Sequence, residues 1–244
     1  MMKMNRVFIG YDSKIDIAYR VLKYSIEKHA PRPVEIRPIV LAELQRNISF
    51  GREFDPLATT EFTYTRFLVP FLCDYKGRTI FMDNDMLCLA DINEIFQLDL
   101  SNYWLRVRKH DYNPITEVKL DGRPQTRYPR KNWSSFMLLN CEKLTVWSKE
   151  NVQTKSGAWL HRFEPIPDEY IGEISDEWNV LDHYDENTKL IHYTEGGPWY
   201  ENHRDHPYGD VWFRYLAEYL QTEEGEALPE HDPWSQVLAE VAGR

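Results

Sequence analysis

The sequence has few cysteines and no long apolar run. Its 3 cysteines, Cys73, Cys88 and Cys141, are scattered and odd in number. A disulfide framework is therefore not expected, and a reducing, cytoplasmic compartment is favoured. No apolar stretch approaches the roughly 20 residues of a membrane-spanning helix. We also expect no secretory signal, because the apolar run within Met1–Tyr11 is too short for one.

Basic clusters are also missing. The formal net charge is −10, which argues against nucleic acid as a partner. The C-terminal stretch is acidic, with Glu223, Glu224, Glu226, Glu230 and Asp232. Anionic lipid would repel such a segment, so no strong membrane anchor is expected.

The most informative stretch that is present ends in two acidic residues. Thr79–Met82 has the residue types of a short buried strand, and Asp83 and Asp85 follow it. If the backbone stays extended, residues two apart project from the same face. Two carboxylates at the end of a buried strand can hold a hard divalent cation. An acidic turn without function would look much the same, so the pair alone is weak evidence.

Strands and helices alternate along the chain. Arg6–Gly10 is predicted to be a buried strand, Ile15–His29 a helix and Val34–Arg37 a second strand. This opening predicts an α/β fold, in which ligands bind beyond the carboxyl ends of parallel strands. The chain has 244 residues, a length for which we expect one domain over residues 1–220 and an acidic tail or docked helix over residues 221–244.

Several polar segments follow predicted strands or precede them. Tyr11 and Asp12 end the first strand, where a site and a helix cap are equally good interpretations. Ser134 and Ser135 precede an apolar run, and their small side chains would permit close approach of a ligand. Glu177–Asn179 is a further candidate site loop.

The order of these motifs resembles glycosyltransferase family 8, which includes glycogenin and bacterial lipopolysaccharide galactosyltransferases. The match spans roughly residues 6–200 and rests on five segments: Phe8–Asp12, Tyr64–Pro70, Thr79–Asp85, Ser134–Asn140 and His192–Trp199. The resemblance implies a GT-A fold, a Rossmann-like mixed and mainly parallel sheet flanked by helices that holds a nucleotide-sugar donor. It also implies a UDP-sugar, manganese and retention of anomeric configuration.

The resemblance also implies roles for individual residues. Asp83, Asp85 and His192 would hold the metal, and Gly196 would lie at the diphosphate. The expected donor-binding residues are Tyr11, Asp12, Arg66, Asp83, Asn84, Ser134, Ser135, Gly196 and Gly197. Asp111 and His161 are the candidate catalytic residues, with a solvated acid and a structural histidine as the competing interpretations.

Three departures from the family pattern stand out. Trp133–Ser135 replaces the usual Asn-Ser-Gly, and Gly197 occupies the position of a phosphate-neutralising lysine. The family's Asp-Gln pair has no clear counterpart, and Trp159–His161 falls near its position. These departures bear on the catalytic group and the transferred sugar.

The expected function is metal-dependent transfer of a hexose, with UDP-hexose favoured as donor, to a saccharide or lipid-linked acceptor. A sugar-nucleotide nucleotidyltransferase is one alternative, although no early glycine-rich loop with a basic residue supports it. A catalytically silent nucleotide-sugar-binding protein is the other, because of the departures above.

His192 is the third predicted metal ligand. It ends the apolar segment Leu190–Ile191, as Asp83 and Asp85 end Thr79–Met82. Strand ends that point the same way in one sheet would bring these side chains together. One nitrogen and two carboxylates suit manganese better than magnesium, which is the alternative ion. Binding should fade below the ordinary imidazole pKa of about 6.5.

Overall fold

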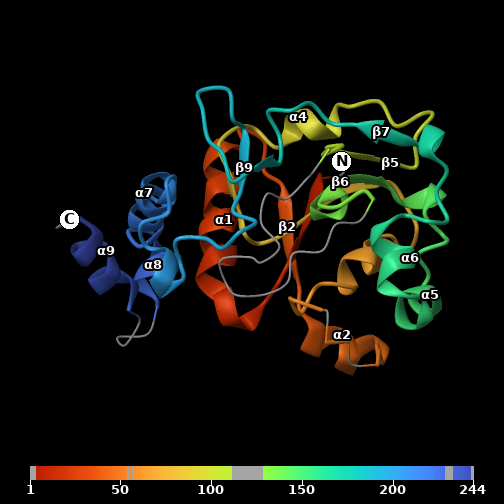
Figure 1. The fold of residues 1–244 in the computed structure, drawn as a ribbon, viewed down its shortest axis with the longest axis horizontal. Coiled ribbons are helices and arrows are strands. Elements are labelled where there is room, and N and C mark those ends of the chain that lie inside the picture. Colours follow the sequence, from red (N-terminus) through yellow and green to blue (C-terminus); the bar gives the residue numbers. More distant parts are fainter. Residues whose placement is uncertain (1–3, 54, 57, 112–128, 229–232, 243–244) are drawn as a thin grey trace.

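The structure is a computed structural model, which describes residues 4–53, 55–56, 58–111, 129–228 and 233–242. Of the acidic residues in the C-terminal stretch, Glu230 and Asp232 lie outside these ranges. Figure 1 shows a central sheet with helices on both of its sides.

The central sheet has six strands in the order β2-β1-β3-β6-β5-β7. Their bounds are β1 Arg6–Gly10, β2 Glu35–Ile39, β3 Arg78–Met82, β5 Leu105–Val107, β6 Phe136–Asn140 and β7 Ile171–Glu173. Pairing is parallel for β2 with β1, β1 with β3 and β5 with β7, and antiparallel where β6 meets β3 and β5. The predicted mixed sheet flanked by helices is confirmed.

A second, smaller sheet lies beside the first. It has the order β4-β9-β8, with β4 at Met86–Cys88, β8 at Val180–Leu181 and β9 at Leu190–His192. β4 and β9 are antiparallel, whereas β8 and β9 are parallel. Because β4 begins only four residues after β3 ends, the chain passes from one sheet to the other through Asp83–Asp85.

The helices are mostly short. The α-helices are α1 Asp16–His29, α2 Leu41–Ile48, α3 Val69–Leu72, α4 Asn93–Phe96, α5 Lys149–Thr154, α6 Gly157–His161, α7 Gly209–Tyr219, α8 Glu223–Glu226 and α9 Trp234–Ala242. Single 3₁₀ turns are η1 Ser13–Ile15, η2 Thr65–Leu68, η3 Trp133–Ser135, η4 Cys141–Lys143, η5 Asp168–Tyr170 and η6 Glu201–His203. Within the described ranges, no helix is both long and apolar enough to cross a bilayer.

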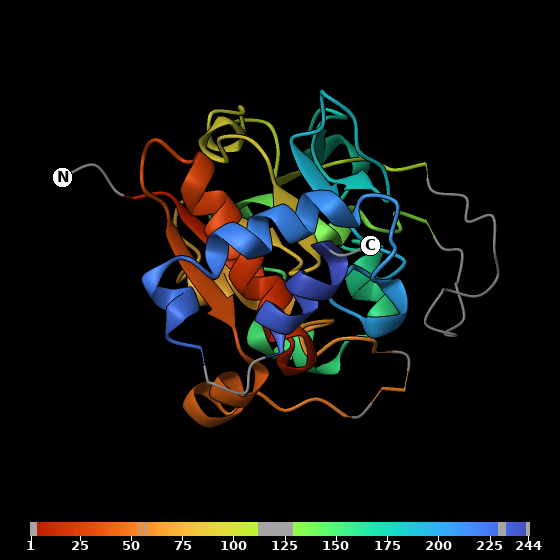
Figure 2. The same ribbon diagram turned by 90° about the vertical axis from the view of Figure 1, so that its left-hand side faces the viewer.

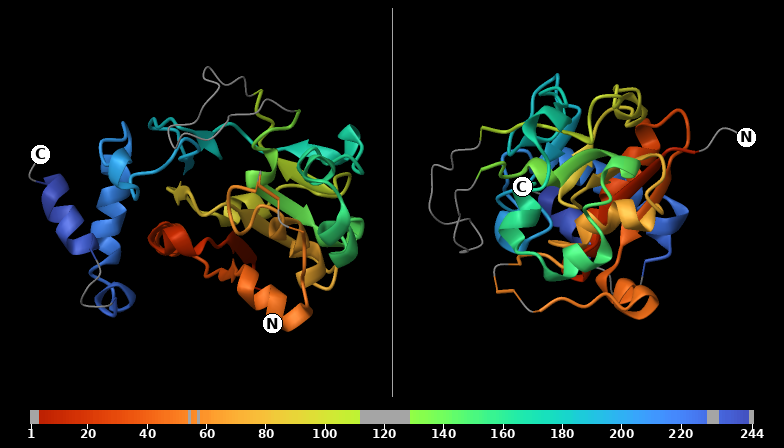
Figure 3. Two further views of the ribbon diagram at one scale, coloured as in Figure 1. Left: turned by 60° about the horizontal axis from the view of Figure 1, so that its bottom comes forward. Right: turned by 90° about the vertical axis from the view of Figure 1, so that its right-hand side faces the viewer.

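Helix α1 is apolar on two sides because it lies between two cores. Leu22 and Ile26 pack with the strand residues of β1 and β3, and Ala18 and Val21 pack with the small sheet and α7. Figure 2 shows α7 crossing over α1, and Figure 3 shows α9 farther out. The C-terminal helix α9 therefore packs on α7, which in turn packs on α1.

Three elements were not expected from the sequence. They are α2, β7 and β8, of which the two strands have three residues and two. Such short strands show no alternation that sequence analysis could detect, because alternation needs about four residues. The predicted strands at residues 6–10, 34–37 and 79–82 and the predicted helix at residues 15–29 are confirmed within one residue at most ends, and the apolar run after Ser135 forms β6.

Candidate functional site

The site lies at the edge of the central sheet where β3 ends. Met82 pairs with Phe136, the first residue of β6, and Asp83 N–H donates to Ser135 O at 2.9 Å. The side chain of Asp83 is nearly buried, with 8 % of the residue exposed. The exit of β3 and the entry of β6 thus hold Asp83 next to the serine pair.

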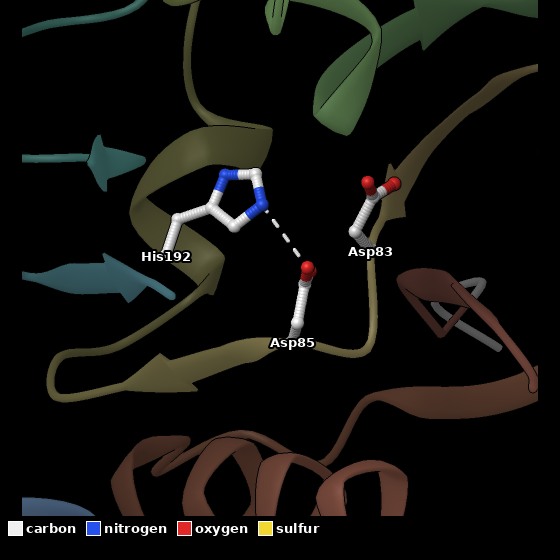
Figure 4. A group of neighbouring side chains, drawn as sticks. All are labelled: Asp83, Asp85 and His192. Carbon is white, nitrogen blue, oxygen red and sulfur yellow. Dashed lines mark ion pairs between the residues drawn. The ribbon is translucent and has the colours of Figure 1, made fainter. Parts of the chain in front are cut away.

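The small sheet brings Asp85 and His192 together. Met86 pairs with His192 in the antiparallel β4–β9 ladder, and Tyr193 N–H donates to Asp85 O at 2.9 Å. His192 Nε2 lies 3.2 Å from Asp85 Oδ1, an approach that Figure 4 marks with a dashed line. One ligand atom from each of Asp83, Asp85 and His192 lies within 4.8 Å of the other two. Ligand atoms at this spacing can surround one cation.

The prediction that His192 lies beside the two aspartates is therefore confirmed, but the strand arrangement that brings them together differs from the expected one. The sequence favours strand ends that point the same way in one sheet. In the structure, β4 and β9 are antiparallel neighbours in the second sheet, and their register places His192 beside Asp85.

A chain of hydrogen bonds orients the imidazole of His192. Its Nδ1 lies 2.8 Å from Asn179 Oδ1, and Asn179 Nδ2 donates to Ser135 Oγ at 3.0 Å. Ser135 Oγ in turn donates to Asn132 O at 2.6 Å. Because an amide oxygen only accepts, Nδ1 carries the proton and Nε2 faces the aspartates. Partners of this kind fix the tautomer of metal-binding histidines.

Protonation of His192 is coupled to the acidic pair. Burial disfavours the charged ring, but Asp85 and Asp83 outweigh it, so the pKa of His192 is raised. When the ring is protonated, it pairs with Asp85. A cation at this place would replace the Nε2 proton, because only the neutral ring can act as a ligand.

Arg66 lies on the other side of Asp83. Its Nη1 is 2.8 Å from Asp83 Oδ1, and both side chains are nearly buried. The same nitrogen donates to Ser134 O at 3.1 Å. Burial raises the pKa of Asp83, Arg66 opposes this rise, and Asp85 adds to it. Arg66 therefore favours the charged form of the carboxylate that a cation would need.

His161 is connected to this arrangement through Ser134. Its Nδ1 lies 3.0 Å from Ser134 Oγ, its ring meets Phe67 edge-on at 5.1 Å, and it forms a hydrogen bond with the Thr63 backbone. Burial lowers the pKa of His161 to about 3, and Arg66 contributes. Its surroundings are those of a packed, neutral histidine. Asp111, the other candidate catalytic residue, is exposed.

Tyr11 and Asp12 follow β1, the parallel neighbour of β3. Tyr11 OH donates to Asp16 Oδ1 at 2.8 Å, and Asp12 Oδ1 accepts from Lys14 N–H at 3.0 Å. Asp12 thus caps η1, the helix-cap interpretation of the sequence. Asn84 is fully buried, and neither polar atom of its amide has a hydrogen-bond partner among the described residues.

Gly196 and Gly197 follow Tyr193, whose amide is bonded to Asp85. Gly196 has φ +120°, and a Cβ there would lie 2.3 Å from the His203 ring. A Cβ on Gly197 would lie 2.1 Å from Trp199. Side chains are therefore excluded at both positions by close packing, and at Gly196 also by backbone conformation.

The donor set fits a divalent cation. It combines two carboxylates from one turn with an imidazole whose tautomer is fixed by Asn179. Mixed oxygen and nitrogen ligands suit manganese and zinc better than magnesium or calcium, which prefer oxygen alone.

Solved structures with the same fold are glycosyltransferases. WbbM, a bifunctional glycosyltransferase, superimposes with a TM-score of 0.64 at 14 % identity over 99 % of this chain and 52 % of its own. The galactosyltransferase LgtC does so with 0.56 at 12 % identity, over 95 % of this chain and 99 % of its own. GlyE of Streptococcus pneumoniae gives 0.56 at 15 % identity, over 99 % of this chain and 63 % of its own. The chain thus spans about half of WbbM and somewhat under two thirds of GlyE.

These likenesses define a protein with the GT-A glycosyltransferase fold, as the sequence predicts. No protein-family model matches the chain. A curated relative, Protein CDI of Arabidopsis thaliana, is 42 % identical over 232 residues, which are 91 % of this chain and 90 % of that protein. The chain belongs to the family of Protein CDI. Membership of glycosyltransferase family 8 itself stays a prediction.

The structure brings part of the predicted set together. Asp83, Asp85 and His192 form one group, and Arg66, Ser134 and Ser135 contact its members directly or through one residue. The roles of Tyr11, Asp12, Asn84, Gly196 and Gly197 stay predictions, as do those of Asp111 and His161. Asn179 was indicated only as part of a candidate loop, because the sequence does not reveal which side chain would meet His192.

Proposed function

We propose that the protein is a metal-dependent glycosyltransferase. It moves a hexose, most simply from UDP-hexose, to a saccharide or lipid-linked acceptor with retention of configuration. The observation that carries the proposal is the Asp83–Asp85–His192 group, with ligand atoms within 4.8 Å of one another, at the strand ends of a GT-A sheet. In α/β sheets, ligands bind beyond such strand ends.

In this proposal the metal is manganese, with magnesium as the alternative. When bound, it supplies Lewis acidity to the leaving diphosphate. Arg66 favours the charged form of Asp83, and Asn179 presents the lone pair of His192 Nε2. Tyr11 and Asp12 border the base and ribose, while Asn84, Ser134, Ser135, Gly196 and Gly197 line the donor. Asp111 and His161 are the proposed groups near the transferred sugar.

A catalytically silent nucleotide-sugar-binding protein is the second candidate. It is favoured by Gly197 at the position of the family's lysine and by the packed surroundings of His161, close to where the Asp-Gln pair would fall. Slow donor hydrolysis separates the two candidates. Release of UDP from UDP-glucose without an acceptor, dependent on manganese, would support the enzyme.

The binding step is tested first, by calorimetry with UDP and manganese. We expect UDP to bind more tightly with manganese than after chelation, because two aspartates would otherwise face the diphosphate as like charges. His192→Ala should weaken manganese binding at least tenfold and leave the fold intact. His183→Ala, which changes an exposed histidine of the neighbouring loop, is the matched control. Equal affinity for UDP with and without metal would contradict the metal bridge.

A further inference from the structure

His110 lies at the same edge of the central sheet as the metal group. β6 pairs antiparallel with both β3 and β5, so β3 and β5 run in the same direction and end at one edge. Asp83 follows β3 directly, and His110 follows the end of β5 by three residues. Trp133 Nε1 donates to His110 O at 3.1 Å, which fastens His110 to the turn that carries Ser134 and Ser135.

The side chain of His110 lies within electrostatic range of His192. The two imidazoles interact electrostatically, and this interaction, after burial and together with Arg108, lowers the pKa of His110 to about 3. At neutral pH the ring is therefore uncharged, with one N–H and one lone pair. His110 is not a member of the group of ligand atoms formed by Asp83, Asp85 and His192.

The Nε2 atom of His110 is a buried polar atom. It is shielded from solvent, and it has no hydrogen-bond partner among the residues that the structure describes. A buried polar atom without a partner costs free energy and calls for an explanation. An oxygen of a bound ligand would supply the partner, and the nearby metal group is where such a ligand would be held.

We propose that His110 contacts the donor, through a hydrogen bond between Nε2 and an oxygen of the nucleotide sugar held at Asp83, Asp85 and His192. The proposal rests on the proposed function and deepens it, because it adds a donor-contacting residue that the family resemblance did not indicate. The oxygen belongs either to the diphosphate or to a sugar hydroxyl. Either one can pair with a neutral imidazole, the phosphate with its N–H and the hydroxyl with its N–H or its lone pair.

The test compares His110→Phe, which keeps a ring of similar size and removes both nitrogens, with His29→Phe. His29 is also a partly buried histidine of lowered pKa, but it lies at the far end of α1 against Tyr215 OH. Affinities for UDP-glucose and for UDP are measured by calorimetry at saturating manganese. Manganese affinity and the melting temperature of each variant are recorded as well.

We expect His110→Phe to weaken UDP-glucose binding about tenfold, the loss of one hydrogen bond, and to leave manganese affinity within twofold. His29→Phe should bind UDP-glucose as the parent does. An equal loss for UDP places the contact on the diphosphate, and a loss confined to UDP-glucose places it on the sugar. His110→Asn, which restores a polar group, should recover part of the affinity.

Unchanged affinity of both His110 variants for both ligands would overturn the proposal and leave the proposed function standing. If the parent itself binds neither UDP-glucose nor UDP with manganese, the proposed function fails, and this proposal fails with it. If His110→Phe does not fold, His110→Asn decides: a loss of UDP-glucose affinity supports the contact, and parent-like affinity refutes it.

Discussion

At the scale of single residues, the site depends on how buried charge is balanced. Two charged neighbours have opposite effects on the protonation of Asp83. Arg66 favours its charged form, and Asp85 disfavours it. Burial is the largest influence, and it raises the pKa of Asp83 above its ordinary value. Without metal, the charged Asp83 therefore costs stability. That cost is absent below pH 4 and grows as the pH rises through the raised pKa.

This balance predicts the effect of removing Arg66. In metal-free protein, Arg66→Met should lower the free energy of unfolding by about 3 kcal/mol at pH 8, because a buried carboxylate loses its partner. The loss should be smaller at pH 5, where Asp83 is largely protonated in the folded state. Urea unfolding at the two pH values measures both losses.

The matched control is the double variant Arg66→Met/Asp83→Asn, which removes the charge along with its partner. We expect it to be more stable than Arg66→Met at pH 8 and to show little dependence on pH over this range. A loss for Arg66→Met that is the same at pH 5 and pH 8 would mean that its packing against Phe62 and Phe81 outweighs the ion pair.

Residue types in the sequence were enough to predict that Asp83, Asp85 and His192 lie together, but not which residues hold them in place. Asp83, Asp85 and His192 are chemically conspicuous residues at the ends of apolar segments. Asn179 acts through side-chain contacts with His192 and Ser135, and Asn132 contributes only its backbone oxygen, which accepts from Ser135 Oγ. Nothing in their local sequence distinguishes them from ordinary loop asparagines, which is why sequence analysis could not assign their roles.

At the scale of elements, segments with a clear residue pattern were predicted, including the short strand Thr79–Met82, whereas α2, β7 and β8 were not. The helical spacing of residues 15–29 and the apolar run of β6 each span several residues of one period. β8 has two residues and owes its existence to pairing with β9. The pairing of β4 with β9 in a separate sheet could not be foreseen, because residue patterns do not show which strands pair, and so the antiparallel register that joins Asp85 to His192 came from the structure alone.

Helix α9 gives a prediction at this scale. Trp234 contacts Trp212 of α7 with ring centroids 5.9 Å apart and lies under the Arg204 guanidinium at 4.8 Å. Since Trp234 is only partly buried, Trp234→Ala should lower the free energy of unfolding by about 1 kcal/mol, less than for a core tryptophan. Urea unfolding measures this loss, and Gln236→Ala, exposed on the same helix, is the control.

The same variant should bind manganese within twofold of the parent, because Trp234 packs on Trp212 of α7, whereas Asp83, Asp85 and His192 lie around the ends of β3 and β9. No change in stability for Trp234→Ala would mean that α9 does not stabilise the fold in solution. The division into a domain over residues 1–220 and a separate tail stays a prediction, and a loss of stability would argue that the two belong to one folding unit.

At the scale of the whole molecule, net charge determines whether the protein binds an anionic lipid surface. The net charge is −10, and the exposed Glu223, Glu224 and Glu226 lie together around α8. One of them, Glu224, is paired with Lys23 at 2.7 Å, which leaves the other two without compensation from that lysine. The exposed large apolar side chains of the described residues, Met4, Tyr170 and Tyr200, are far apart in sequence.

We therefore predict no association with anionic membranes. The protein should not pellet with phosphatidylserine vesicles at low salt, where charge repulsion is screened least. Phosphatidylcholine vesicles give the neutral reference, and protein without vesicles gives the background. If the protein pelleted with anionic but not with neutral vesicles, a basic surface would have to outweigh the net charge.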